Sequence, residues 1–240
     1  MHVDLSGGGL FSRALVHLEP GEKFVSDAGA MIRASSNIDI DVTTGSQGKG
    51  GLLGGLGRLL TGDTFFLSTY EVSDGRPGEV GLAPTHMGEV REVSVSPDEA
   101  WLCAGGSFLG AASTLTLDTR FQGLRGLLGG ESLSLLRVSG SGQLLVSALG
   151  MLTSMEINGE LIVDTGHLVA FTEGLAYRID KIGGGWINTW LSGEGFVMRF
   201  SGKGRIILQS HNPTRFGQML GPLLPERQSM LGPLLPERQS

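Results

Sequence analysis

The 240-residue chain is poor in cysteine, in charge and in long apolar runs. Its single cysteine, Cys103, excludes an internal disulfide and suits a reducing compartment. One of the two longest uncharged runs, residues 138–155, is interrupted by Ser, Gly, Gln and Thr, so it does not predict a membrane-spanning helix. The start reads MHVDLSGGGLF, which lacks the features of a signal peptide or a mitochondrial presequence. We therefore expect a soluble, cytoplasmic protein.

The sequence also lacks the motifs of common catalytic and nucleotide sites. There is no complete G-x-G-x-x-G, and the stretch GSQGKGG misses the Walker spacing because Thr43 stands five residues before Gly48. The five histidines are at least 15 residues apart and form no H-x-H pair, so no metal site is predicted. No G-x-S-x-G elbow occurs, and the apolar surroundings of Cys103 favour an inert thiol. We predict no catalytic, cofactor-binding or metal-ligating residue, and we expect the chain not to be an enzyme.

What the chain does have is glycine and period-two alternation. Forty glycines, one residue in six, suit many tight turns between short strands. Alternation of apolar and polar residues predicts half-buried strands at 38–42, 90–96, 114–119 and 177–182. Long helical periodicity is nearly absent, so we predict an all-β fold. A net charge of −6 and a pI near 5.4 argue against non-specific binding to DNA, to RNA or to an anionic membrane.

Three sequence elements recur in the same order three times. The first is VSDAGAMIRA, LCAGGSFLGA and IVDTGHLVAF, aligned on Gly29, Gly106 and Gly166. The second is LLTGDTFFLSTY, LLGGESLSLLRV and WLSGEGFVMRFS, and the third is PGEVGLAP, SGQLLVSA and KGRIILQS. We therefore predict three internal β-sandwich or short double-stranded β-helix repeats fused in one compact chain, over residues 1–95, 96–155 and 156–215. A unit of about 60 residues is marginal alone, so the repeats should pack against one another.

The second element repeats an acid at one position, Asp63, Glu131 and Glu194. One acid per repeat at the same turn indicates a structural task, such as accepting backbone N–H bonds, and not catalysis. Apolar residues near the same turns are expected to pack between units or subunits, or to form an exposed interaction surface. The residues of that candidate surface are Leu52, Leu53, Leu56, Trp186 and Trp190.

The last segment, residues 216–240, contains MLGPLLPERQS twice in tandem without a change. Two prolines per copy interrupt a helix, so we expect a flexible appendage and not a functional site. Just before it, SHNP at 210–213 is expected to stop a strand.

The acid-glycine turns, together with PGEVGLAP, GGSFLGA, VDTGHLVAF and LSGEGFVMRFSGKGRIILQSHNP, resemble the family named after the yeast "altered inheritance of mitochondria" protein. The resemblance covers residues 1–215. It implies a fold similar to the tryptophan RNA-binding attenuation protein, three such units per chain, and homotrimers that place nine units in a ring. The fungal relative is linked to mitochondrial inner-membrane organisation. The family has no established catalytic residues, so the resemblance assigns none.

From these observations we expect a non-enzymatic, oligomeric β-protein that serves as a scaffold or interaction module, with contact to a membrane complex left open. Its expected partners are further copies of itself, as a homotrimer, and a protein not identified by the sequence. One alternative is a small-ligand-binding protein or unrecognised enzyme that uses pockets between repeats. RNA binding is the second alternative, which the acidic composition and the absence of a repeated Lys/Arg constellation disfavour.

Overall fold

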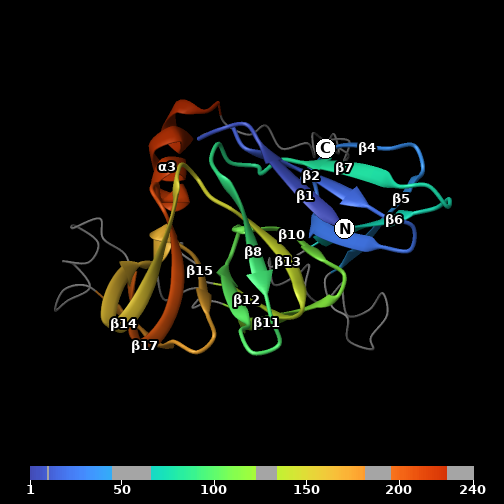
Figure 1. The fold of residues 1–240 in the computed structure, drawn as a ribbon. Coiled ribbons are helices and arrows are strands. Elements are labelled where there is room, and N and C mark those ends of the chain that lie inside the picture. The colour runs from blue at the N-terminus through green and yellow to red at the C-terminus, as the bar shows by residue number, and fades with distance from the viewer. Residues whose placement is uncertain (10, 45–65, 123–133, 182–195, 226–240) are drawn as a thin grey trace, which may run out of the picture.

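The computed structural model describes residues 1–9, 11–44, 66–122, 134–181 and 196–225. Nearly every element in these ranges is a β-strand, which confirms the all-β prediction (Figure 1). The strands expected at 38–42, 90–96, 114–119 and 177–182 are present, with ends shifted by a few residues at most.

The strands follow one another along the chain with short connections. The first seven are β1 (His2–Ser6), β2 (Arg13–Leu18), β3 (Lys23–Asp27), β4 (Met31–Ala34), β5 (Ile38–Thr44), β6 (Phe66–Val72) and β7 (Gly78–Leu82). The next six are β8 (Val90–Val95), β9 (Trp101–Ala104), β10 (Phe108–Ala112), β11 (Leu115–Gln122), β12 (Ser134–Gly140) and β13 (Gly142–Ser147). The last are β14 (Leu152–Asp164), the 3-10 turn η1 (Thr165–His167), β15 (Leu168–Thr172), β16 (Ala176–Lys181) and β17 (Phe196–Gln209).

The period-two pattern sets which side of each strand is buried. In β2, Ala14, Val16 and Leu18 are buried, while the residues between them face outward. In β5 the pattern is less complete than the sequence suggests. Ile38 is buried, but Ile40 and Val42 are 44% and 60% exposed, because among the described residues β5 pairs only with β6 and forms an edge of its sheet.

Three antiparallel sheets are formed. Their strand orders are β1-β2-β7-β4, then β5-β6-β3-β10-β13-β8, then β11-β12-β9-β15-β17-β14, with β16 also paired to β17. The second sheet therefore joins early and middle strands through β3 and β10, and the third joins middle and late strands through β9 and β15. The segments that the sequence predicts as repeats are thus connected by shared sheets.

The same four strand pairings occur in three successive stretches of the chain. In the first, β2 and β4 pair with β7 while β3 and β5 pair with β6. In the second, β8 and β10 pair with β13 while β9 and β11 pair with β12. In the third, the two halves of β14, with β15 and β16, pair with the two halves of β17. The shared order of pairings supports the prediction that the stretches are copies of one unit, which stays a prediction. By the pairing pattern, the second stretch begins at β8 and the third begins at β14.

Three apolar clusters fill the interior, and neighbouring stretches share them. The cluster around Phe24 and Tyr70 also contains Leu109, from β10 in the next stretch. The cluster around Trp101 likewise contains Val169, from β15 in the stretch after. The third cluster surrounds Phe171 and Phe200. A side chain from one stretch thus completes the core of the stretch before it, as expected for units that are marginal alone.

The segments that lead into these three stretches run side by side. Parallel bridges join Phe11 to Gly88 and Gly88 to Gly150, and the Gly150 N–H donates to the carbonyl of Met87 at 2.9 Å. A Cβ on Gly88 would lie 1.9 Å from the carbonyl oxygen of Ala148, so this close approach requires glycine.

We expect Gly88→Ala to destabilise the fold by about 2 kcal/mol or more, because the added methyl group forces two backbone segments apart. Urea unfolding followed by circular dichroism measures the loss. Gly75→Ala is the matched control, because its Cβ meets nothing within 4 Å. Equal stability of the two variants would contradict the requirement for glycine at Gly88.

A helix begins the C-terminal segment, which the sequence did not predict. Helix α3 (Pro213–Leu220) starts at Asn212, whose side chain accepts hydrogen bonds from the N–H groups of Thr214 and Arg215. Pro213 occupies the first turn, where its missing N–H costs nothing. A 3-10 turn, η2 (Gly221–Leu223), follows and takes in Pro222. The remainder of the duplicated tail, from residue 226, lies outside the described residues.

Candidate interaction surface

Several titratable groups in the described part of the chain take part in turn contacts. No group of three or more His, Cys, Asp or Glu residues there is placed to hold a metal ion. His167 lies in η1, where its Nδ1 contacts the carbonyl oxygen of Gln209 at 2.8 Å. Gly166, beside it, is required because the Asn212 side chain approaches within 2.0 Å of where a Cβ would stand. These groups hold the turn before β15 against the end of β17.

Cys103 is buried in β9, as the sequence predicted, and burial raises the pKa of its thiol to about 12. We expect the native protein to react with a thiol-specific reagent at pH 8 at least about 100-fold more slowly than the unfolded chain, because the thiolate is scarce and inaccessible. An aromatic disulfide reagent, which releases a coloured thiol when it reacts with cysteine, gives both reaction rates by absorbance. The rate with denaturant divided by the rate without it is the expected ratio. Similar rates in both states would show that Cys103 is reachable in the folded protein.

Two histidines meet on the outer face of the first sheet. The rings of His2 and His17 stack with centroids 5.7 Å apart, and Asp4 contacts their Nε2 atoms at 2.8 and 3.0 Å. Hydrogen bonds from His2 and then from His17 hold the pKa of Asp4 below its usual value. Glu79, 3.4 Å from His17, also accepts a hydrogen bond from Arg33 at 2.9 Å. This exposed row ties β1, β2, β7 and β4 together across the sheet.

The surface residues singled out from the sequence, Leu52, Leu53, Leu56, Trp186 and Trp190, lie outside the described residues. The repeated acids Asp63, Glu131 and Glu194 also lie outside them. The prediction that these residues form an interaction surface or a turn therefore stays a prediction. Two unpaired strand edges, which we call the first end and the second end, are the clearest candidates among the described residues.

The first end is strand β4. Its counterparts in the pairing pattern, β10 and β15, are each paired on both sides, whereas β4 pairs only with β7 among the described residues. Met31 and Ile32 on this strand are 42% and 55% exposed. A hollow of about 160 Å³ opens beside Ile32, with Arg33 and Leu15 also in its wall. An unpaired strand with exposed apolar side chains is a ready surface for adding another strand.

The second end is the later half of β14. Its counterparts, β3 and β9, are each paired on both sides, whereas residues 160–164 pair only with β17 in the described part of the chain. Ile162 at the middle of this edge is 53% exposed. A shallow hollow of about 670 Å³ extends from this edge across β17 to β16.

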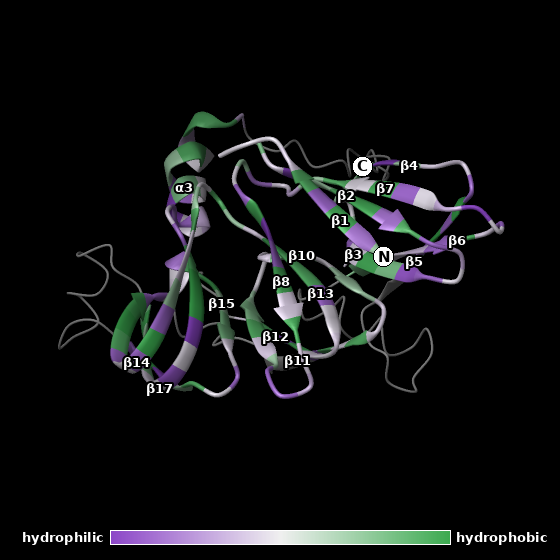
Figure 2. Cartoon of the chain, in the orientation of Figure 1, coloured by the Kyte–Doolittle hydropathy of each residue, from purple (hydrophilic) through white to green (hydrophobic). Residues whose placement is uncertain are grey.

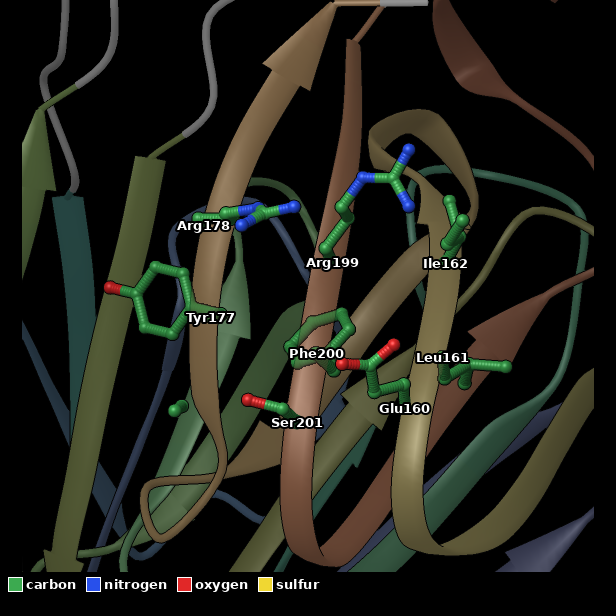
Figure 3. A pocket seen from close by; sticks show the side chains of 9 residues that line it. Glu160, Leu161, Ile162, Tyr177, Arg178, Arg199, Phe200 and Ser201 are labelled. Atoms are coloured by element: carbon green, nitrogen blue, oxygen red, sulfur yellow. The ribbon is translucent and has the colours of Figure 1, made fainter.

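The floor of this larger hollow combines apolar and cationic side chains (Figure 3). Ile162, Arg199 and Arg178 come from three adjacent strands and lie side by side in the strand register. Both arginines contact Asp180, at 2.7 Å for Arg199 and 3.1 Å for Arg178, so part of their charge is already compensated. The hollow is open and one-sided, which suits contact with another macromolecule better than enclosure of a small molecule.

Neither end was found from the sequence, although a signal was present. The aligned elements read AMIRA, SFLGA and HLVAF, so Ile32 falls in line with Leu109 and Val169. All three positions are apolar, but the structure shows that only Leu109 and Val169 are buried. The alignment alone could not show this, because burial depends on which strand lies next to each copy.

Helix α3 adds further apolar surface. Met219 is 60% exposed, and Leu223 and Leu224 just beyond it are 77% and 64% exposed. Hydrophobic colour covers the end of α3 and the turn after it (Figure 2). Among the described residues, no helix has the length and apolar character needed to cross a membrane.

Comparison with known proteins gives a consistent result. The sequence model of the family described as mitochondrial biogenesis AIM24 matches residues 3–211. An uncharacterised protein of Streptococcus pyogenes serotype M6 is 27% identical over 216 residues, which cover 88% of this chain and 86% of that protein. The crystal structure of a Streptococcus pyogenes protein has a TM-score of 0.78 and 24% identity, and the match covers 93% of this chain and 99% of that one. That structural likeness shows a shared fold.

Proposed function

Because the chain belongs to the mitochondrial biogenesis AIM24 family, we propose that it is a non-enzymatic, self-associating β-protein that acts as a scaffold or interaction module. The observation that carries this proposal is a pair of unpaired strand edges with exposed apolar side chains, β4 at one edge of the first sheet and the later half of β14 at one edge of the third. Each edge exposes a large apolar side chain, Ile32 on one and Ile162 on the other.

An open strand edge is a liability for a folded protein. Backbone N–H and C=O groups on an open edge are satisfied by water but invite pairing with any other strand, so proteins usually protect them. Here the described edges carry neither proline nor lysine, and burying an isoleucine side chain contributes about 1.5–3 kcal/mol. Association through both edges would remove the two exposed isoleucines from water and pair both strands.

Association through two different edges is head-to-tail, which gives a ring if the rotation closes and a filament if it does not. The homotrimer expected from the family resemblance is a closed ring of this kind, and we propose it as the working assembly. A ring removes every β4 and β14 edge at once, which matches the need to protect them.

A scaffold role fits the chemistry of the described residues. Ion pairs such as Arg199–Asp180 lie on the surface, no group of three or more His, Cys, Asp or Glu among the described residues is placed to hold a metal ion, and the larger hollow is open. We propose that partner proteins, including those of a membrane-associated complex, bind the assembled ring in the cytoplasm. Exposed apolar residues on α3 and the turn after it, such as Met219 and Leu223, offer surface for such contacts.

A small-ligand role is the second candidate, and its support is the mixture of cationic and apolar side chains that line the hollow beside Ile162. Arg178 and Arg199 could meet an anionic group there, while the exposed face of Ile162 could contact an apolar part. This role predicts a bound molecule of defined mass in the native protein.

Native mass spectrometry of the protein isolated from its own cells separates these functions. A multiple of the 25.2 kDa chain mass, with protein partners and no small molecule, supports the scaffold. A retained metabolite in stoichiometric amount would favour the ligand-binding role. A bare monomer at micromolar concentration would contradict self-association.

A further inference from the structure

Two strand junctions inside the chain share one register. At the first, β10 pairs with β3 so that Gly110 faces Ser26. At the second, β15 pairs with β9 so that Ala170 faces Cys103. Gly110 and Ala170 each stand four residues after the aligned glycines Gly106 and Gly166. Their partners each stand three residues before the aligned glycine of the preceding stretch. An alignment made from sequence thus agrees with the strand register at both junctions.

The strands at these junctions also share a local irregularity. The pairing of β10 with β13 shifts register between Phe108 and Gly110, and that of β15 with β17 shifts between Leu168 and Ala170. Strand β4 has the same shift, between Met31 and Arg33, in its pairing with β7. In all three strands the shift follows the aligned glycine by the same number of residues. Strand β4 is therefore shaped like the two strands that do form a junction.

Burial differs at matching positions in a way that points to a missing neighbour. Leu109 and Val169 are 2% and 0% exposed because each enters the core of the preceding stretch, whereas Ile32 at the matching position is 55% exposed. On the other side of the junction, Leu102 is 4% exposed, whereas Ile162 at the matching position is 53% exposed. Among the described residues, no strand lies beside β4 on its open side, and none lies beside the later half of β14 on its open side. A second copy of the chain has both missing neighbours to offer.

We propose that β4 of one copy pairs antiparallel with the later half of β14 of the next copy, in the register of the two internal junctions. Counting from Gly29 and Gly166 places Arg33 opposite Val163, Ala34 opposite Ile162 and Ser35 opposite Leu161. Ile32 then enters the apolar cluster around Phe171 and Phe200 of the next copy, as Val169 enters the cluster around Trp101. This inference rests on the proposed self-association and adds its partner strand, its direction and its register.

Arg33 is the one departure from the internal junctions, where glycine and alanine stand. Its guanidinium donates to Glu79 on β7 at 2.9 Å, and its side chain passes over Gly81 on the outer face of the sheet. The charge of Arg33 is therefore paired within its own copy before a neighbour arrives. This arrangement lets the strand edge be approached without burying an unpaired charge.

Paired cysteines test the register directly. Cysteines at Ala34 and Ile162 would have Cα atoms about 4.5–5.5 Å apart across an antiparallel pair, within disulfide range. We expect A34C/I162C to form interchain disulfides under mild oxidation, giving covalent oligomers on a non-reducing gel. The control A34C/E160C moves one cysteine two residues along the same strand face, where the diagonal distance of about 7–8 Å disfavours a disulfide. Cys103 is buried and does not interfere.

Mixing the single variants A34C and I162C tests the direction. Head-to-tail pairing predicts that each variant alone stays uncrosslinked and that the mixture gives a disulfide-linked dimer. Self-crosslinking of A34C alone would show β4 meeting β4 and would overturn the proposal, as would stronger crosslinking in A34C/E160C than in A34C/I162C. Light scattering on the same samples separates failure of the register from failure of self-association. An oligomer that forms no A34C–I162C disulfide would overturn the proposed register alone. A monomer would overturn the proposed self-association as well. Circular dichroism confirms that each variant is folded.

Discussion

Replacing Ile32 by aspartate is expected to weaken self-association by about 100-fold or more. The substitution removes about 1.5–3 kcal/mol of apolar burial at each contact and places a carboxylate where the next copy's core should receive an isoleucine. A loss of about 1.4 kcal/mol in binding free energy raises the dissociation constant tenfold. A total loss of about 2.8 kcal/mol from the lost burial and the added carboxylate therefore gives the expected factor of about 100. Sedimentation velocity over a range of concentrations measures the change.

The fold itself should survive, because Ile32 is 55% exposed in the single chain. Val42→Asp is the matched control, since Val42 is 60% exposed on β5, which takes no part in the proposed junction. We expect this control to associate like the unchanged protein. Equal weakening by both substitutions would show that added charge, and not the β4 edge, governs association.

Replacing Phe171 by alanine is expected to lower the stability of the fold by about 3–5 kcal/mol. Phe171 is completely buried in β15, and its ring meets Phe200 edge-on at 4.9 Å and Tyr177 at 5.2 Å. The substitution removes the buried ring and leaves a cavity at the centre of the third cluster. Thermal unfolding should show a midpoint lower by roughly 6–20 °C for a chain of this size.

Phe11→Ala serves as the control for this prediction, because it removes the same side chain from a position that is 74% exposed. We expect its stability to stay within about 0.5 kcal/mol of the unchanged protein. If Phe171→Ala were as mild as Phe11→Ala, the third cluster would not be the packed core that the structure describes.

Much of the fold follows from local pattern. Strand alternation is set by which residues are apolar at every second position, so β5, β8, β11 and β16 could be found from sequence alone. Glycine at Gly29 and Gly106 also carried a local signal, because both have positive φ values, 92° and 79°, which other residues avoid.

Features that depend on distant neighbours could not be found this way. Ile40 and Val42 continue the apolar alternation of Ile38 but remain exposed, because edge position is a property of the whole sheet. Helix α3 was missed because its start depends on an Asn212 cap and on Pro213 in the first turn, and the two prolines of each tail copy suggested disorder instead. The exposed Ile32 and Ile162 were missed because their aligned counterparts look the same in sequence.

The most direct test of the account is hydrogen exchange at one edge in response to a substitution at the other. Within residues 161–163 of β14, some amide N–H groups point away from β17. In the assembled protein these amides should exchange slowly, because backbone carbonyls of β4 in the next copy accept their hydrogen bonds. In the Ile32→Asp variant, whose altered residue lies on β4, the same amides should exchange rapidly. Rapid exchange of residues 161–163 in both proteins would contradict the proposed pairing between copies.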